Sequence, residues 1–186
     1  NYREEPDSSG LVKREKIMLG YLLKGLSCYN EEVSRKALLI IGQYIFGSGK
    51  LTLEEKYLYY RYFYKKLLTL LKTDAEGDIN FYNNAAALNH IYRFVTDYSF
   101  LHGEIELPQN KRIAFFPGTF DPFSSGHKGI VDAIRNEGFE TYLALDEFSW
   151  SKNTQPRMRR REIISMSIAA SPDVFLFLDD FPVNIA

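Results

Sequence analysis

The stretch FFPGTFDPFSSGHKGI, residues 115–130, separates an apolar run from a helical pattern. The apolar run RIAFF, residues 112–116, is typical of a strand buried in a parallel sheet. The pattern GHKGIVDAIRNEG, residues 126–138, predicts a helix that stops at Gly138. The stretch is therefore expected to connect a strand to a helix. Its glycines, its Asp-Pro pair and its histidine make it a candidate binding loop.

The alternation of strand and helix continues toward the end of the chain. FETYLAL (139–145) alternates like a strand, MRRREIISMSIAAS (158–171) is helical, and DVFLFL (173–178) predicts a third strand. This order, βαβαβ, is one mononucleotide-binding half of a doubly wound parallel sheet. Antiparallel pairing of the first two strands would contradict this prediction.

Residues 11–102 show helical periodicity instead. We expect helices in residues 11–29, 31–46 and 53–72, and a fourth from Asn83 or Asn84 to residue 101. GSGK (47–50) and the polar loop TDAEGDIN (73–80) separate them. Four helices with short connections predict a small bundle or two stacked hairpins.

Start signals support two of these helices. Ser8 or Ser9 is expected to cap the first helix, and Thr52 with Glu55 predicts a capping box at the third. Pro108 and Asn110 are typical of a linker. The predicted fold is therefore α + α/β, with an all-helical domain in residues 1–107 and a Rossmann-like parallel-sheet domain in residues 108–186.

Composition and charge exclude several classes of protein. The chain has 186 residues, 45% of them apolar, which is enough for one large or two small cores. A net charge of −1 provides no overall field for nucleic acid or an anionic membrane. Cys28 is the one cysteine, so no intrachain disulfide forms, and no apolar run has the length of a membrane span. The N-terminus also lacks the apolar segment of a secretory signal, so we expect a cytoplasmic protein.

Ligands of such sheets bind beyond the carboxyl ends of the strands, where this loop lies. Gly118 is expected to let a ligand approach the backbone, and Asp121-Pro122 to set a turn that aims Phe120. Gly126 and His127 fall at the helix start, where free amides and the positive end of the dipole favour a phosphate. The imidazole could donate a hydrogen bond to a phosphoryl oxygen there.

GTFDPFSSGH, residues 118–127, resembles the signature of the nucleotidyltransferase superfamily. This superfamily includes the nicotinamide- and nicotinate-mononucleotide adenylyltransferases, phosphopantetheine adenylyltransferase and the cytidylyltransferases. Its members carry a Gly-x-Phe-Asp-Pro turn, then His or Thr, one further residue, and Gly-His. The resemblance covers residues 111–180 and implies the Rossmann-like fold, with this chain containing the first half of the catalytic domain.

The resemblance implies a reaction. A phosphate of the acceptor attacks the α-phosphorus of a nucleoside triphosphate, here ATP, and pyrophosphate leaves with the help of Mg²⁺ and without a covalent enzyme intermediate. Nicotinate or nicotinamide mononucleotide, in NAD biosynthesis, is the preferred acceptor. His127 would contact the α-phosphate, and Ser124 occupies the position of the family's His or Thr. The nucleotide-binding residues implied by the motif are Gly118, Thr119, Phe120, Asp121 and Gly126.

A second cluster lies in SWSKNTQPRMRRR, residues 149–161. Lys152 stands where family members often place a lysine that binds phosphate, and Trp150 is a candidate for stacking on a base or pyridine ring. Arg157 and Arg161 are candidate phosphate ligands, because the guanidinium fork suits bidentate contacts. The neighbouring arginines are expected to be solvated. A solvated lysine and a packed tryptophan are the alternatives for Lys152 and Trp150.

The family also has an Ile-Ser-x-Thr-like turn with an arginine, which holds the triphosphate, and nothing after FLFLDDFPVNIA supplies it. We therefore expect residues 1–186 alone to bind nucleotide weakly and turn over little. Two alternatives stay open. One is a cytidylyltransferase or a phosphopantetheine adenylyltransferase-like enzyme. The other is a degenerate, non-catalytic nucleotide-binding module whose helical domain, rich in tyrosine at residues 57–64, binds a protein partner or self-associates.

Overall fold

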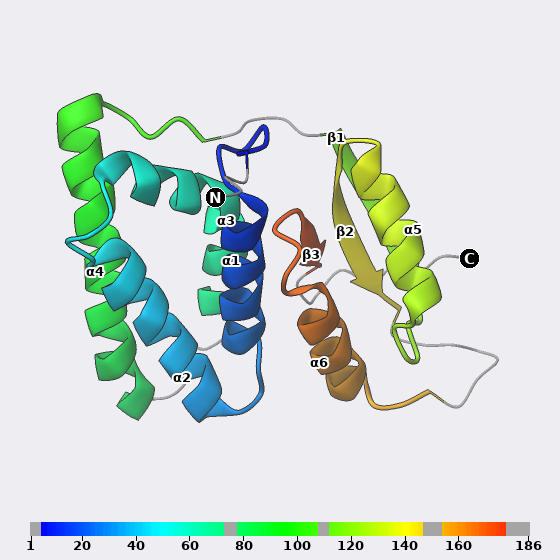
Figure 1. Cartoon of the computed structure of the whole chain (residues 1–186). Helices are drawn as coiled ribbons and strands as arrows, with labels where there is room; N and C mark the ends of the chain where they lie inside the picture. The colour runs from blue at the N-terminus through cyan, green and yellow to red at the C-terminus, as the bar shows by residue number, and fades with distance from the viewer. Residues whose placement is uncertain (1–4, 73–77, 108–111, 147–153, 178–186) are drawn as a thin grey trace. The chain divides into compact units, whose positions relative to one another are not determined.

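The computed structural model describes residues 5–72, 78–107, 112–146 and 154–177 (Figure 1). The chain divides into two compact units, Asn1–Pro108 and Gln109–Ala186. The described part of the first unit is helical, and that of the second combines helices with a sheet. No helix in the described ranges is both long and apolar enough to cross a membrane.

The helical unit contains α1 (Lys13–Leu26), α2 (Glu31–Ile40), the π-helix η1 (Ile41–Phe46), α3 (Leu53–Lys72) and α4 (Asp78–His102). The four predicted helices are confirmed, and the second continues from α2 into η1. The predicted start of the fourth helix is wrong, because α4 begins at Asp78, inside the expected polar loop.

Side-chain caps account for the starts of α2 and α3. The predicted capping box at α3 is confirmed: the Glu55 amide donates to the Thr52 hydroxyl at 3.2 Å, and the Thr52 amide donates to Glu55 Oε2 at 2.8 Å. Asn30, which the sequence analysis did not single out, accepts from the amides of residues 32 and 33 at 3.0 and 3.3 Å. Both caps satisfy amides that have no acceptor within the helix.

The prediction that Ser8 or Ser9 caps α1 is wrong. The N-cap is Val12, whose amide donates to Glu15 Oε2 at 2.8 Å. The other carboxylate oxygen of Glu15 accepts from the Tyr59 hydroxyl of α3, also at 2.8 Å. One glutamate therefore stabilises the start of α1 and joins it to α3.

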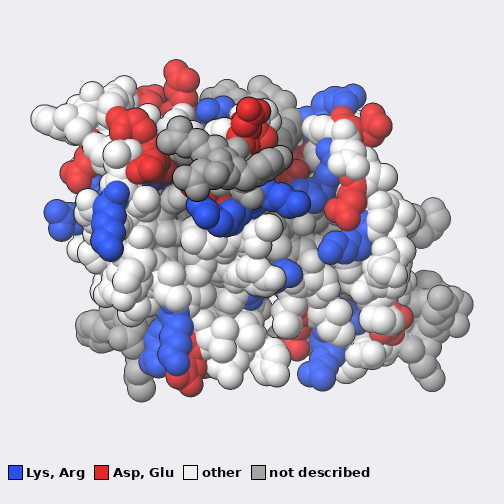
Figure 2. Space-filling model, in the orientation of Figure 1, with Lys and Arg blue, Asp and Glu red and all other residues white. Residues whose placement is uncertain are grey.

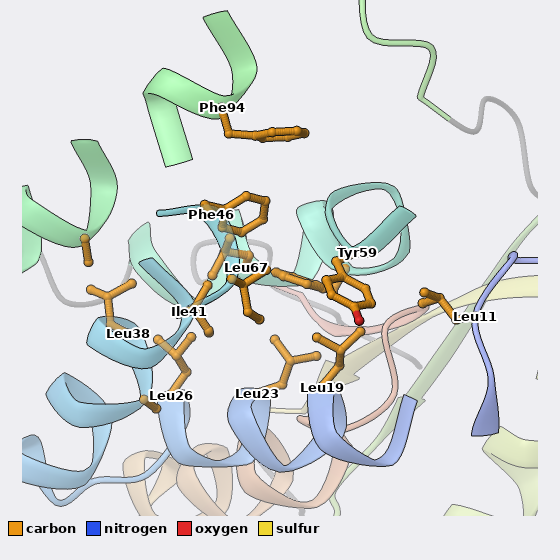
Figure 3. Close-up of a cluster of buried hydrophobic side chains, with 14 residues drawn as sticks. Leu11, Leu19, Leu23, Leu26, Leu38, Ile41, Phe46, Tyr59, Leu67 and Phe94 are labelled. Atoms are coloured by element: carbon orange, nitrogen blue, oxygen red, sulfur yellow. The ribbon is translucent and has the colours of Figure 1, made fainter. Parts of the chain in front are cut away.

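The core of this unit lies between α1, α2, η1, α3 and α4. Figure 3 shows Leu19, Leu23 and Leu26 projecting from α1 toward Ile41 and Leu67. Aromatic rings close the other side, with Phe46 5.1 Å from Phe94 and 6.1 Å from Tyr60 between ring centroids. The tyrosines of the α3 stretch are all buried or half-buried: Tyr57, Tyr59, Tyr60, Tyr62 and Tyr64. They therefore contribute to the packing of the unit.

Replacing Tyr59 by phenylalanine should lower the free energy of unfolding by about 1.5 kcal/mol at pH 7, because a hydrogen bond to a carboxylate is lost. Burial and the Glu15 carboxylate raise the pKa of Tyr59 in the folded protein. The stability contributed by the neutral phenol is therefore present below the unfolded pKa of about 10 and is lost as pH rises toward the folded value. Urea unfolding at pH 7 and pH 10.5 should show a smaller alkaline loss in Tyr59→Phe than in wild type. Equal losses would contradict this account.

The second unit contains β1 (Arg112–Gly118), α5 (Ser125–Asn136), β2 (Phe139–Leu145), α6 (Arg157–Ile168) and β3 (Val174–Leu176). The strands are parallel, in the order β1-β2-β3. The predicted three-stranded parallel sheet and the mixed α/β class are thus confirmed. The stop predicted at Gly138 is also confirmed, because its φ of 83° lies in the left-handed region just after α5.

Both helices pack on the same face of the sheet. Phe116, Leu143 and Leu176 lie opposite one another in the strand register, so their side chains share a face. They form one apolar cluster with Val131 of α5 and Ile164 of α6. In Figure 1, α5 and α6 both start at the end toward which the β2 arrow points. The loop after β1 and the starts of both helices therefore gather beyond the carboxyl ends of the strands.

Candidate functional site

Figure 2 shows basic and acidic side chains interspersed on the face in view. This agrees with the net charge of −1. Binding of an anion must then depend on individual donors and on local geometry.

The turn after β1 is shaped by Phe120. Its φ of 46° lies in the left-handed region, which is rare for a residue with a side chain, and its ring is 2% exposed. The ring packs edge-on against Phe116 at 5.4 Å and Phe123 at 5.6 Å. A Cβ on Gly118 would lie 2.9 Å from this ring. The ring of Phe120 therefore occupies the space that a side chain at residue 118 would take, and the approach of a ligand to the backbone of Gly118 stays a prediction.

Asp121 ties this turn to the segment before α6. Its Oδ2 accepts from the Gln155 amide at 2.8 Å, across 34 residues of sequence. The Asp121-Pro122 bond is cis. At the strand ends, the Asp146 amide donates to the Gly118 carbonyl at 3.0 Å. The loops that follow β1 and β2 are thus joined at their bases.

His127 is the third residue of α5 and takes part in a capping box with Ser124. The Ser124 amide donates to Nδ1 of His127 at 3.0 Å, and the Ser124 hydroxyl lies 2.9 Å from the same nitrogen. Because an amide can only donate, Nδ1 is the acceptor and the ring proton is on Nε2. No hydrogen bond within the described ranges uses Nε2. The imidazole therefore caps the helix with one nitrogen and keeps an N–H donor on the other.

Aromatic neighbours hold the imidazole in this orientation. Phe123 stacks on it with ring centroids 5.6 Å apart and an interplanar angle of 25°. Phe120 meets it edge-on at 5.2 Å. A ring held by packing and by a hydrogen bond presents its donor without a further ordering cost when a ligand arrives.

The first turn of α5 has room beside its amides. The first amides of a helix have no intrahelical acceptor and lie at the positive end of its dipole. A Cβ on Gly126 would make only ordinary contact, 3.6 Å from the Ser124 hydroxyl. Packing within the protein therefore does not require a glycine at this position, unlike at Gly118.

Arg160 is buried, with 1% of its surface exposed. The prediction that this arginine is solvated is therefore wrong. Its Nη1 donates to the carbonyls of Thr119 at 2.7 Å and Asp146 at 3.1 Å, and its Nε donates to the Gln155 carbonyl at 2.9 Å. Residues 160, 164 and 168 are all buried at helical spacing. That spacing is the signal that could have separated Arg160 from its neighbours.

The remaining predicted residues divide into two groups. Arg157 and Arg161 are half-buried and lie four residues apart on α6, which places them on one side of that helix near its start. Lys152 and Trp150 lie outside the described residues. The structure thus gathers Ser124, Gly126 and His127 at the start of α5, and joins the turn at residues 118–121 to the start of α6.

No family model and no solved structure matches this chain. The features of this chain that point to a function are therefore the motif in residues 118–127 and the geometry beyond the carboxyl ends of β1 and β2.

Proposed function

We propose that this chain belongs to an enzyme that transfers a nucleotidyl group from ATP to a phosphate-bearing acceptor, with a Rossmann-like nucleotidyltransferase domain in its second unit. Nicotinate or nicotinamide mononucleotide is the proposed acceptor. The observation that carries this proposal is the bond from the Ser124 amide to Nδ1 of His127. It leaves an Nε2–H donor at a helix start, inside a motif that resembles that of nucleotidyltransferases.

The chemistry follows from these groups. The free amides of α5 and the Nε2–H of His127 bind the α-phosphate, where negative charge builds as the acceptor phosphate attacks. Pyrophosphate leaves with the bonding electrons of the broken P–O bond. Arg157 and Arg161 supply positive charge for the remaining phosphates. The protein acts by positioning and by charge stabilisation, and no covalent intermediate is required.

The described residues do not fit a resident Mg²⁺ site. Among them, no three His, Cys, Asp or Glu side chains lie together as ligands, and Asp121 uses one carboxylate oxygen to accept from Gln155. Mg²⁺ commonly binds through substrate phosphates with few protein ligands. We therefore propose that it enters with the triphosphate, and we assign no step to it.

Gly126→Ala tests whether phosphate uses the first turn of α5. The added methyl group has room in the protein but stands beside the proposed phosphate, so ATP should bind about tenfold more weakly. This loss corresponds to about 1.4 kcal/mol. Alanine is also the better helix former, so the melting temperature should be unchanged or slightly higher.

Gly129→Ala is the matched control, because it lies on the same helix and a Cβ there meets no atom within 4 Å. Calorimetric titration of the full-length protein with MgATP should show wild-type affinity for this variant. If Gly126→Ala and Gly129→Ala bound MgATP with equal affinity, the phosphate would not bind at the start of α5. Repeating the titration with MgCTP separates the adenylyltransferase proposal from the cytidylyltransferase alternative.

A second candidate function is a nucleotide-binding module without catalysis. The observation that favours it is that Ser124 and His127 bond to each other as a helix cap. Such a module would bind ATP at the start of α5 but release no pyrophosphate when the acceptor is added.

A further inference from the structure

We propose that Arg160 is a positioning residue of the transfer reaction, which fixes the loops after β1 and β2 and the start of α6 in one arrangement. This inference rests on the proposed function. The inference goes beyond the motif in residues 118–127, because Arg160 lies outside that motif. The candidate phosphate ligands on α6 are its neighbours Arg157 and Arg161.

The contacts of Arg160 carry the argument. Its three acceptors are backbone carbonyls at residues 119, 146 and 155, which belong to three different segments at the same end of the sheet. Residue 119 lies in the turn before α5, and residue 155 is the one whose amide donates to Asp121. A single guanidinium therefore joins the segments that must keep a fixed spacing if His127 and Arg157 are to act on one triphosphate.

The buried charge of Arg160 also supports its connection to the proposed phosphate site. None of the ion pairs within the described ranges includes Arg160, and the hydrogen bonds that its guanidinium makes there go to backbone carbonyls. Burying a charge without a counter-ion is costly, and an apolar side chain of similar length would fill the same space. An anionic ligand beyond the strand ends would offset part of this cost. The field of Arg160 thus favours a phosphate at the proposed site without touching it.

The test compares Arg160→Lys and Arg160→Met with Arg159→Met in the full-length protein. Lysine keeps the charge but cannot donate to three carbonyls in the geometry of the guanidinium fork. Arg159 is exposed on the same helix and serves as the control. Steady-state kinetics should show kcat lowered about 10–100-fold in Arg160→Lys, with KM for ATP within about threefold, the pattern of misplaced groups. The kcat of Arg160→Met should fall at least as far as that of Arg160→Lys. Arg159→Met should keep the wild-type kcat and KM.

Hydrogen exchange provides a readout that does not depend on catalysis. In Arg160→Lys the amides of Asp146 and Gln155 should exchange at least tenfold faster, while that of Leu143 in β2 stays protected. A wild-type kcat in Arg160→Lys would overturn the inference. So would a kcat that returns to the wild-type value at a lower temperature where the variant is fully folded, because the role would then be purely structural. If the wild-type protein transfers no nucleotide, the proposed function itself fails, and that result is distinguishable from an active wild type with an equally active variant.

Discussion

Replacing His127 by alanine is expected to lower the turnover of nucleotidyl transfer by roughly 10²–10³-fold, the scale for loss of one preorganised donor. The Nε2–H of His127 should act mainly on the transition state, where charge builds on the α-phosphoryl group. The affinity for ATP should change much less, because the α5 amides and the arginines of α6 still bind phosphate. Steady-state kinetics on the full-length protein measures both quantities.

The structure adds a control that separates catalysis from capping. Glutamine is a natural partner at the third position of a capping box and can accept from the Ser124 amide, as His127 does. His127→Gln should therefore keep the melting temperature of wild type and still lose at least tenfold in turnover. Ser124→Ala should cost less turnover than His127→Ala, because the Ser124 hydroxyl lies beside Nδ1 of His127 and its loss leaves the Nε2–H donor in place. Turnover of His127→Ala within about threefold of wild type, or about 0.65 kcal/mol, would show that the histidine is only a cap.

Replacing Gly42 by alanine is expected to lower the free energy of unfolding by about 2–3 kcal/mol, the upper range for an overpacked core. A Cβ at Gly42 would lie 2.5 Å from the Cα of Ala87 and 2.8 Å from its carbonyl oxygen. These are backbone atoms of α4, so the added methyl group cannot be accommodated by a rotamer change and η1 must move away from α4. Thermal melts should show a decrease of about 10 °C.

Gly49→Ala is the control for this prediction. Gly49 lies just after η1, and a Cβ there meets no atom within 4 Å. Its melting temperature should stay close to that of wild type. A Gly42→Ala protein as stable as Gly49→Ala would mean that η1 and α4 do not approach each other as closely as the structure shows.

Much of the fold follows from local signals in the sequence. A short apolar run predicts β1, alternation predicts β2, and Gly138 predicts the stop of α5 because a left-handed residue is needed there. Two features were not accessible in this way. The start of α4 at Asp78 lies in a polar stretch that is typical of a loop, and η1 contains Gly42, whose backbone lies close to Ala87 of α4. The apolar periodicity of the sequence reports neither feature.

In the candidate site too, some residues could be predicted from local sequence and others could not. The motif located Ser124, Gly126 and His127 because these residues lie within four positions of one another at a helix start, where local geometry places them together. Arg160 was missed because its acceptors at residues 119, 146 and 155 become neighbours only once β1 and β2 pair. A run of arginines does not reveal by itself which one is buried. The closeness of the Phe120 ring to Gly118 was missed as well, because it accompanies the left-handed conformation of Phe120, which the sequence pattern does not report.

The proposed transfer of a nucleotidyl group can be measured by incubating the full-length protein with Mg²⁺, ATP labelled at the α-phosphate, and nicotinate or nicotinamide mononucleotide. We expect the label to appear in a dinucleotide and unlabelled pyrophosphate to be released in equal amount. Folded His127→Ala protein should give at most about one hundredth of the wild-type rate. A wild-type protein that binds ATP but transfers no more label than His127→Ala would contradict the account and leave a nucleotide-binding module.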